Sequence, residues 1–229
     1  MTSEAQEISE AVASWLHYKS LTGLRGLFTE SSMAVPIAEY LSSRYGSEVE
    51  TEKAHPLFDN GKKGRPKQID FVRVRRGDRT WDAVYECKFQ RPDFKNIVGD
   101  LCRLACLAQA DGIGRPTRYF VFAGKPGPKG MPLEKSFNTG DGSRSSYFDG
   151  ILRRDESFVS IEFAFSIRDL HPKQFEVFKG FAENNQVSLP SRIVTKLSGW
   201  SKTSKYVCAV WQIKSAQGSK LRSAGELIF

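Results

Sequence analysis

The sequence predicts an α/β protein in which a mixed β-sheet is flanked by helices. Residues 68–72 and 83–89 are rich in Val, Ile, Phe and Tyr, as strands are, and a basic turn at 76–79 separates them. A long apolar helical pattern over 93–111 then precedes a short apolar run at 117–123. A short, continuous apolar run after a helix is typical of a buried strand that lies parallel to an earlier one.

The chain has 229 residues, 40% of them hydrophobic, which is enough to bury a sizeable core. We predict one elaborated domain over 1–229. Its core lies at about 27–124, a flexible loop rich in Gly, Pro and Ser at 125–150, and accessory strands and a helix at 151–229.

Two helices are predicted before the hairpin. The first follows Ser3 and carries apolar residues at helical spacing over 8–16. The second carries an apolar stripe up to residue 41 and leads into a strand at 48–52; Glu30 lies at the inward end of this stripe and Glu39 points about 180° away. Two other interpretations remain: Glu30 is a first-turn acid favoured by the helix dipole, or Pro36 opens the helix and Glu39 is its N3 acid.

The register of the hairpin follows from its turn. If Gly77, Asp78 and Arg79 form a three-residue loop, Asp70 lies directly opposite Glu86. The pleat then gives one apolar core face and one polar face. The core face has Ile69, Phe71, Trp81, Ala83, Tyr85, Cys87 and Phe89, and the polar face has Asp70, Glu86, Lys88 and Gln90.

Opposed carboxylates repel each other, so the pair needs a counter-charge. A Mg²⁺ ion prefers oxygen ligands and commonly binds one or two carboxylates, and the stem of Lys88 is long enough to reach the same place. The alternative is an exposed cross-strand ladder of Glu and Lys, which is how most alternating charges on strands behave.

Asp70 followed by Glu86-Cys87-Lys88 resembles the signature of the PD-(D/E)XK nuclease superfamily, whose fold is called restriction-endonuclease-like. The order helix, three strands, helix, strand over residues 27–124 is similar to the α-β-β-β-α-β core of that superfamily. Ile69 stands where the motif's name has proline. The resemblance implies that Asp70 and Glu86 are metal ligands, that the Cys87 carbonyl is a further ligand, and that Lys88 is the catalytic lysine. It also implies that Glu30 joins the metal site, with Glu39 as the runner-up.

Charge provides an independent line of argument. The net charge is +8 and the isoelectric point about 9.3. One basic block, with Lys62, Lys63, Arg65 and Lys67, precedes the Asp70 strand; a second occupies residues 192–222. Basic clusters beside a metal site suit binding of a phosphate backbone. Ordinary solubilising charge is the alternative.

Other features are interpreted as structural. Asp100 and Arg103 are expected to form a solvated stripe on the 93–111 helix, the alternative being that they are partners of the site. Strands are predicted at 157–166 and 206–213, with a helix from Pro172 whose phenylalanines are core. The four cysteines are expected to be buried free thiols in a reducing compartment. No segment has the length and hydropathy of a membrane span or a signal peptide, so a cytoplasmic location is expected.

Together these features predict a Mg²⁺-dependent nuclease, with Mn²⁺ as a substitute, that acts on DNA in preference to RNA. Gln90 would orient Lys88 or the substrate. Restriction, phage defence and DNA repair are the expected settings, with a homodimer if both strands are cut. Two alternatives stay open: a catalytically silent module that binds nucleic acid or a partner, and a structural subunit of a larger complex.

Overall fold

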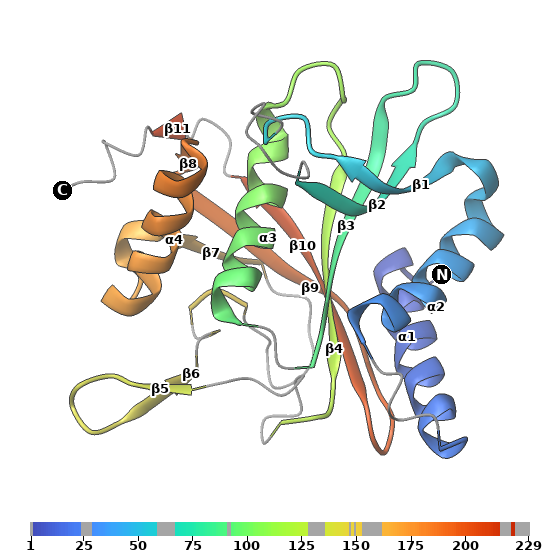
Figure 1. The fold of residues 1–229 in the computed structure, drawn as a ribbon, viewed down its shortest axis with the longest axis horizontal. Coiled ribbons are helices and arrows are strands. Elements are labelled where there is room, and N and C mark those ends of the chain that lie inside the picture. Colours follow the sequence, from blue (N-terminus) through green and yellow to red (C-terminus); the bar gives the residue numbers. More distant parts are fainter. Residues whose placement is uncertain are drawn as a thin grey trace.

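The computed structural model describes residues 2–23, 29–58, 67–90, 93–127, 136–146, 148, 150–152, 162–215 and 221–222. In this part of the chain a seven-stranded sheet lies between helices on both faces (Figure 1). Its strands, in spatial order, are β1 (Val49–Ala54), β2 (Gln68–Val74), β3 (Trp81–Phe89), β4 (Thr117–Gly124), β10 (Val207–Ser215), β9 (Arg192–Lys202) and β7 (Glu162–Ser166). Among these described strands β3 and β4 run parallel, and the other neighbours are antiparallel. The predicted α/β class with a mixed sheet is confirmed.

Two hydrophobic cores lie on opposite faces of the sheet. The helices α1 (Glu4–Leu21) and α2 (Glu30–Tyr45) pack on one face, against Phe71 and Tyr85. The helices α3 (Phe94–Cys106) and α4 (Pro172–Asn185) pack on the other, against Val84 and Trp211. From α2 to β4 the order of elements is the predicted one, so the sequence patterns identified these elements correctly.

The helices begin at residues whose side chains satisfy the unpaired amides of the first turn. Ser3 accepts a hydrogen bond from the Gln6 amide to start α1. Thr29 and Ser32 form a reciprocal capping box at α2, and Asp93 caps α3. Because the capping box starts α2 at Glu30, Pro36 lies inside the helix, and the interpretation that Pro36 opens it is wrong.

The register of the hairpin is confirmed over two pairs, does not extend to the predicted pair of Asp70 with Glu86, and is wrong near the turn. Phe71 pairs with Tyr85 and Val72 with Val84, as predicted. A β-bulge between Arg73 and Val74 then shifts the register, so Arg75, and not Arg76, hydrogen-bonds Thr80, with 2.7 Å between Arg75 N and Thr80 O. The connection is therefore one residue longer than the predicted three-residue loop.

Both faces of β3 are buried, although the sequence predicted one polar face. Every residue of β3 except Asp82 is buried, because β3 is an interior strand with a parallel neighbour and helices on both sides. Trp81 lies in the α3 core because the bulge at Asp82 reverses its side, and Ile69 joins that core too, beyond the end of the β2–β3 ladder. The remaining predicted core-face residues pack against α1 and α2: Phe71, Ala83, Tyr85, Cys87 and Phe89.

The accessory elements follow β4. The predicted helix from Pro172 is α4, and the predicted strand at 206–213 is β10. Within the strand predicted at 157–166 the structure describes β7, Glu162–Ser166, and residues 157–161 lie outside the described part. The predicted loop at 125–150 contains a short hairpin, β5 (Ser136–Asn138) with β6 (Arg144–Ser146). The sequence interpretation did not predict β9, nor the short pair β8 (Leu189–Pro190) with β11 (Leu221–Arg222). The described part of the chain also contains three short 3-10 helices: η2 (Gly46–Glu48), η3 (Leu107–Gln109) and η4 (Ile167–Asp169).

A close backbone contact fixes α1 on β9. A Cβ atom at Gly199 would lie 2.0 Å from the Ala5 carbonyl oxygen, so only glycine fits at this crossing. The Gln6 side-chain amide donates to the Trp200 carbonyl at 3.1 Å and accepts from the Trp200 amide at 3.0 Å. The N-terminal helix is thereby held on the sheet at a defined position.

Candidate functional site

The site begins where β2 and β3 stop pairing. The last backbone pair is Phe71 with Tyr85, one residue short of Asp70 and Glu86. The Cys87 amide of β3 donates instead to Asp70 Oδ2 at 2.7 Å. A side chain therefore satisfies a backbone donor that a longer ladder would have paired, and the Asp70 carboxylate is fixed at this end of the ladder.

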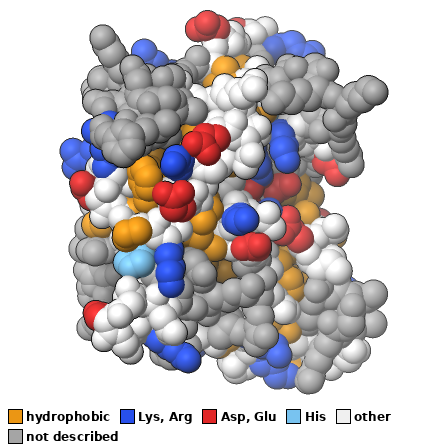
Figure 2. Space-filling model, turned by 60° about the vertical axis from the view of Figure 1, so that its left-hand side comes forward, with side chains coloured by type: hydrophobic (Ala, Val, Ile, Leu, Met, Phe, Trp, Pro, Cys, Tyr) orange, Lys and Arg blue, Asp and Glu red, His pale blue; other side chains and the backbone are white. Residues whose placement is uncertain are grey.

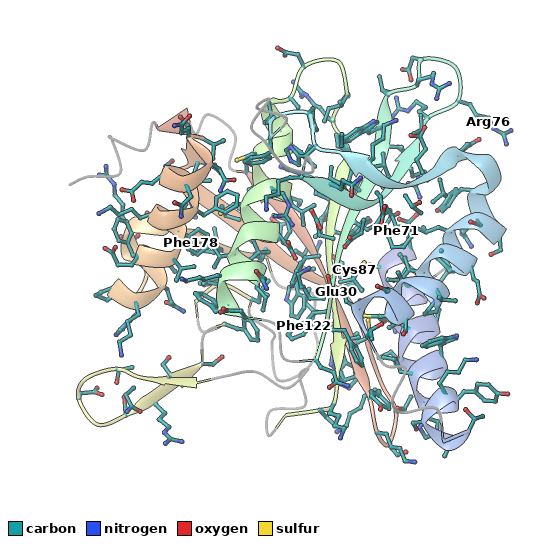
Figure 3. All side chains as sticks on the ribbon, in the orientation of Figure 1. Glu30, Phe71, Arg76, Cys87, Phe122 and Phe178 are labelled. Carbon is teal, nitrogen blue, oxygen red and sulfur yellow. The ribbon has the colours of Figure 1, made fainter. Side chains whose placement is uncertain are left out.

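Lys88 connects the two sides of the sheet. Its Nζ donates to Glu30 Oε1 of α2 at 2.8 Å and to the Cys87 carbonyl at 3.1 Å, and lies 3.0 Å from Asp100 Oδ2 of α3. Glu30 is the first residue of α2, and Figure 3 shows it beside Cys87 near the centre of the molecule. Charges from both helix layers thus converge on one ammonium group.

Glu86 is paired with α3. The exposed fraction of its side chain is 2%, and its Oε1 accepts from Arg103 Nε at 3.0 Å. The Arg103 guanidinium also donates to Asp100 Oδ1. These two residues are one helical turn apart on α3, so one arginine bridges a carboxylate of its own helix and one of the sheet.

His55 contacts the backbone of Arg103. His55 is fully buried, its Nε2 lies 3.1 Å from the Arg103 carbonyl, and its Nδ1 accepts from the Leu57 amide at 3.2 Å. The Nε2 atom therefore carries the proton and donates. Burial lowers the pKa of His55 to about 4, so the ring is neutral at physiological pH.

The cluster carries more negative than positive groups. Burial raises the pKa of Asp70 to about 6, although the Cys87 amide and Lys88 act in the opposite direction. Burial also raises the pKa of Glu86 well above its usual value, with the charge of Asp100 adding to the effect. Burial by itself would lower the pKa of Lys88, but Asp100 and Glu30 raise it above the usual value.

A cation fits the charge and donor chemistry of this cluster. Four carboxylates (Glu30, Asp70, Glu86 and Asp100) face two cationic side chains (Lys88 and Arg103), so the carboxylates outnumber the cations by two. The described residues contain no group of three or more His, Cys, Asp and Glu side chains with the spacing of a metal site. A Mg²⁺ site with one or two carboxylates, a backbone carbonyl and water does not require such a group.

Two hollows open on either side of the cluster. One, of about 390 Å³, lies between α2 and the strands β1 and β2, and its lining includes Glu30, Val35, Glu52, Asp70 and Phe71. The other, of about 350 Å³, lies between the start of β2, α3 and α4, and its lining includes Lys67, Lys88, Lys95 and Arg103. Figure 2 shows acidic and basic side chains gathered side by side near the middle of one face of the molecule.

The structure brings most of the predicted site residues together. Asp70, Glu86, Cys87, Lys88 and Glu30 form one interacting cluster, although none of the described contacts joins the Asp70 and Glu86 carboxylates directly. Glu39 is exposed on α2, away from this cluster.

Gln90 lies just past β3 with φ of 59°, and its amide donates to the Ala123 carbonyl. This left-handed backbone interrupts the alternation of the strand, and no contact between Gln90 and Lys88 is described. Lys67 lines the second hollow. Lys62, Lys63 and Arg65 lie outside the described residues.

The sequence interpretation missed three residues of the site. The solvated stripe predicted for Asp100 and Arg103 is wrong: Asp100 is 1% exposed and both residues pair with the sheet. His55 was not assigned to the site at all. Two charged residues one turn apart in the apolar part of the helix were the available signal, because buried charges need partners.

Comparison of the chain with protein-family models, with curated proteins and with solved structures gives no match. No helix in the described part of the chain combines the length and hydropathy needed to cross a membrane. All four cysteines are buried free thiols.

Proposed function

We propose that this protein is a divalent-metal-dependent nuclease that hydrolyses phosphodiester bonds, built on a restriction-endonuclease-like core. The observation that carries the proposal is the charged cluster at the point where β2 and β3 stop pairing. There Asp70 accepts from the Cys87 amide, Lys88 donates to Glu30 of α2, and Glu86 pairs with Arg103 of α3. A structural salt bridge would need one carboxylate for each cation, whereas this cluster has two carboxylates in excess.

Each residue has a chemical role. Asp70, Glu86 and the Cys87 carbonyl supply hard oxygen ligands for Mg²⁺, with Mn²⁺ as a substitute. When bound, the ion supplies positive charge at a phosphate oxygen and makes a coordinated water more acidic. Lys88 holds a water or a phosphate oxygen beside these ligands, and Glu30 fixes the position of the Lys88 ammonium. His55 and Arg103 position Glu86 without touching the substrate.

The substrate class follows from charge. The basic block that ends at Lys67 precedes β2, and the net charge of the whole chain is +8, both of which favour a polyanionic partner. DNA is the proposed substrate in preference to RNA, in restriction, phage defence or repair. A homodimer would serve cleavage of both strands of a duplex.

One observation favours a second candidate, a nucleic-acid-binding module without turnover. Glu86 and Lys88 are each paired inside the protein, with Arg103 and Glu30 respectively, so the cluster has partial internal compensation without a metal. In that case the chain would bind nucleic acid with a marked salt dependence and would leave it intact.

Cleavage assays separate the two candidates. Purified protein is incubated with supercoiled plasmid, linear duplex and single-stranded DNA in the presence of Mg²⁺, Mn²⁺ or EDTA. We expect metal-dependent cleavage that Asp70→Asn abolishes; this substitution keeps an oxygen acceptor for the Cys87 amide, so the fold is preserved. Glu30→Gln should lower the rate, while Glu39→Gln, on the exposed face of the same helix, serves as its matched control.

The nuclease proposal fails if the wild type binds DNA but no metal produces cleavage, or if Asp70→Asn cleaves as fast as the wild type. Equal melting temperatures of the variants establish that a lost activity does not reflect a lost fold. A contaminating nuclease is identified by activity that persists at the same level in Asp70→Asn.

A further inference from the structure

The hollow between the start of β2, α3 and α4 differs in chemistry from the one on the other side of the cluster. Its volume is about 350 Å³, and polar groups of three elements line it: Lys67 and Gln68 of the β2 segment, Lys95 and Asn96 of α3, and Asn185 of α4. The opposite hollow is lined by Glu30, Glu52 and Asp70 together with apolar side chains. An anion is therefore favoured on the α3–α4 side and repelled on the α2 side.

The cationic groups of this hollow fall into two kinds. Lys88 and Arg103 are already paired with carboxylates, and the exposed fractions of their side chains are 11% and 14%. Lys67 and Lys95 are exposed, and within the described part of the chain neither has an ion pair. Two positive charges thus remain at the mouth of the hollow, with no acid among its lining residues except Asp100, which the buried cations already engage.

Both free lysines extend from a fixed backbone. The Lys67 carbonyl accepts from the His55 amide at 2.9 Å, and the Lys95 amide donates to the Asp93 cap of α3 at 3.3 Å. The hollow is therefore lined in advance by ordered elements, with the ammonium groups at the ends of their stems. Gln68 and Asn96 add neutral amide donors, which suit an oxygen-rich anion.

We propose that this hollow binds a phosphate group of the substrate, next to the phosphate that is cut, with Lys67 and Lys95 as its charged contacts. Compact ammonium groups are common phosphate binders because they act as point charges. The hollow shares Lys88 with the candidate catalytic cluster, so a strand with a phosphate at Lys88 would place its next phosphate here. The phosphate site rests on the chain's geometry, and its assignment to nucleic acid rests on the proposed function.

The test measures binding without turnover. Wild type and Lys67→Gln/Lys95→Gln are titrated, in EDTA, against a fluorescent single-stranded DNA of about twelve nucleotides over a series of salt concentrations, and against inorganic pyrophosphate by calorimetry. We expect the double variant to bind the oligonucleotide about tenfold more weakly at low salt, as the loss of a charge-assisted contact predicts. The slope of log Kd against log salt should fall by about 0.7, the value for one phosphate contact on a single strand.

The matched control is Lys19→Gln/Lys125→Gln, which removes the same net charge from lysines that line neither hollow. If the two double variants weaken binding equally, only the net charge acts, and the phosphate site is refuted. All four substituted lysines lie at least partly exposed, and melting curves check that each variant is folded.

The outcomes of the two titrations distinguish failure of the phosphate site from failure of the proposed function. Binding of pyrophosphate that depends on Lys67 and Lys95, with no binding or cleavage of DNA, supports the phosphate site and refutes nucleic acid as its source, leaving a free nucleotide. If Lys67→Gln/Lys95→Gln binds DNA like the wild type and still cleaves it with a metal, the phosphate site is refuted and the nuclease proposal is intact.

Discussion

Substitution of Arg103 tests whether the charge cluster is held together as the structure shows. Arg103 Nε lies 3.0 Å from Glu86 Oε1, and the exposed fractions of the two side chains are 14% and 2%. Arg103→Met keeps the aliphatic stem but leaves Glu86 and Asp100 without this cation. Removing one partner of a buried pair costs about 3–5 kcal/mol of unfolding free energy. We expect a loss of this size, near the magnitude of a 4 Å pair at an effective dielectric constant of about 20.

The pH dependence of this loss has a definite sign. Without Arg103, the pKa of Glu86 in the folded state rises further above its value of 4.5 in the unfolded chain, because the opposing charge is gone. A carboxyl group with a raised folded pKa destabilises the fold at pH values above its unfolded pKa. The destabilisation of Arg103→Met should therefore be largest near neutral pH and shrink as the pH falls toward about 4.5.

A double-mutant cycle measured by urea denaturation isolates the pair. Glu86→Gln in the Arg103→Met background should restore part of the stability, with a coupling free energy of at least about 1.5 kcal/mol. Arg115→Met, an exposed arginine, is the control and should change stability by less than about 0.5 kcal/mol. A loss below about 1 kcal/mol for Arg103→Met, or strict additivity with Glu86→Gln, refutes the buried pair as a determinant of the site.

Three further predictions concern the fold, acid stability and metal binding. Gly199→Ala should lower the free energy of unfolding by at least about 3 kcal/mol, because its Cβ would lie 2.0 Å from the Ala5 carbonyl oxygen. Gly180→Ala, with no atom within 4 Å, should stabilise α4 by up to about 1 kcal/mol. Chemical denaturation compares the two variants, and equal effects contradict the close contact. Because burial lowers the pKa of His55 from 6.5 to about 4, the free energy of unfolding should fall by about 3 kcal/mol as the pH drops through that interval. In His55→Gln this part of the pH dependence should vanish. A pH profile of stability that the substitution leaves unchanged contradicts the neutral buried ring. Mg²⁺ or Mn²⁺ should raise the melting temperature of the wild type and EDTA should reverse the rise, while Asp70→Asn should respond weakly; an equal rise in both argues against Asp70 as a ligand.

Local pattern identified most of the fold because periodicity and capping act over a few residues. The β2–β3 register agrees with the prediction at Phe71–Tyr85 because the bulge at Asp82 offsets a connection that is one residue longer than predicted. The bulge at Asp82 was not predictable, because it depends on the contacts of Arg73. The Arg73 Nε donates to Asp82 Oδ2 at 2.9 Å, and its guanidinium also pairs with Glu4 of α1. The contact between Arg73 and Glu4 joins residues far apart in the sequence.

The strand β9 was missed although its burial alternates along the chain. Ile193, Thr195, Leu197 and Gly199 are its inward positions, and two of these are weakly hydrophobic or have no side chain. A period of two is hard to recognise when small or polar residues occupy the buried positions. Gly199 in particular is explained by the helix that crosses it, and not by the strand.

The sequence alone determined which residues had the chemistry of a site: Asp70, and Glu86 and Lys88 two residues apart on one strand. The tertiary structure decided how these charges are compensated. It buried both faces of β3 and aligned Asp100 and Arg103 of α3 with the cluster, and it opened an acidic and a basic hollow on its two sides. The physical reason is that secondary structure depends on near neighbours, whereas the partner of a buried charge is set by whichever distant element packs against it.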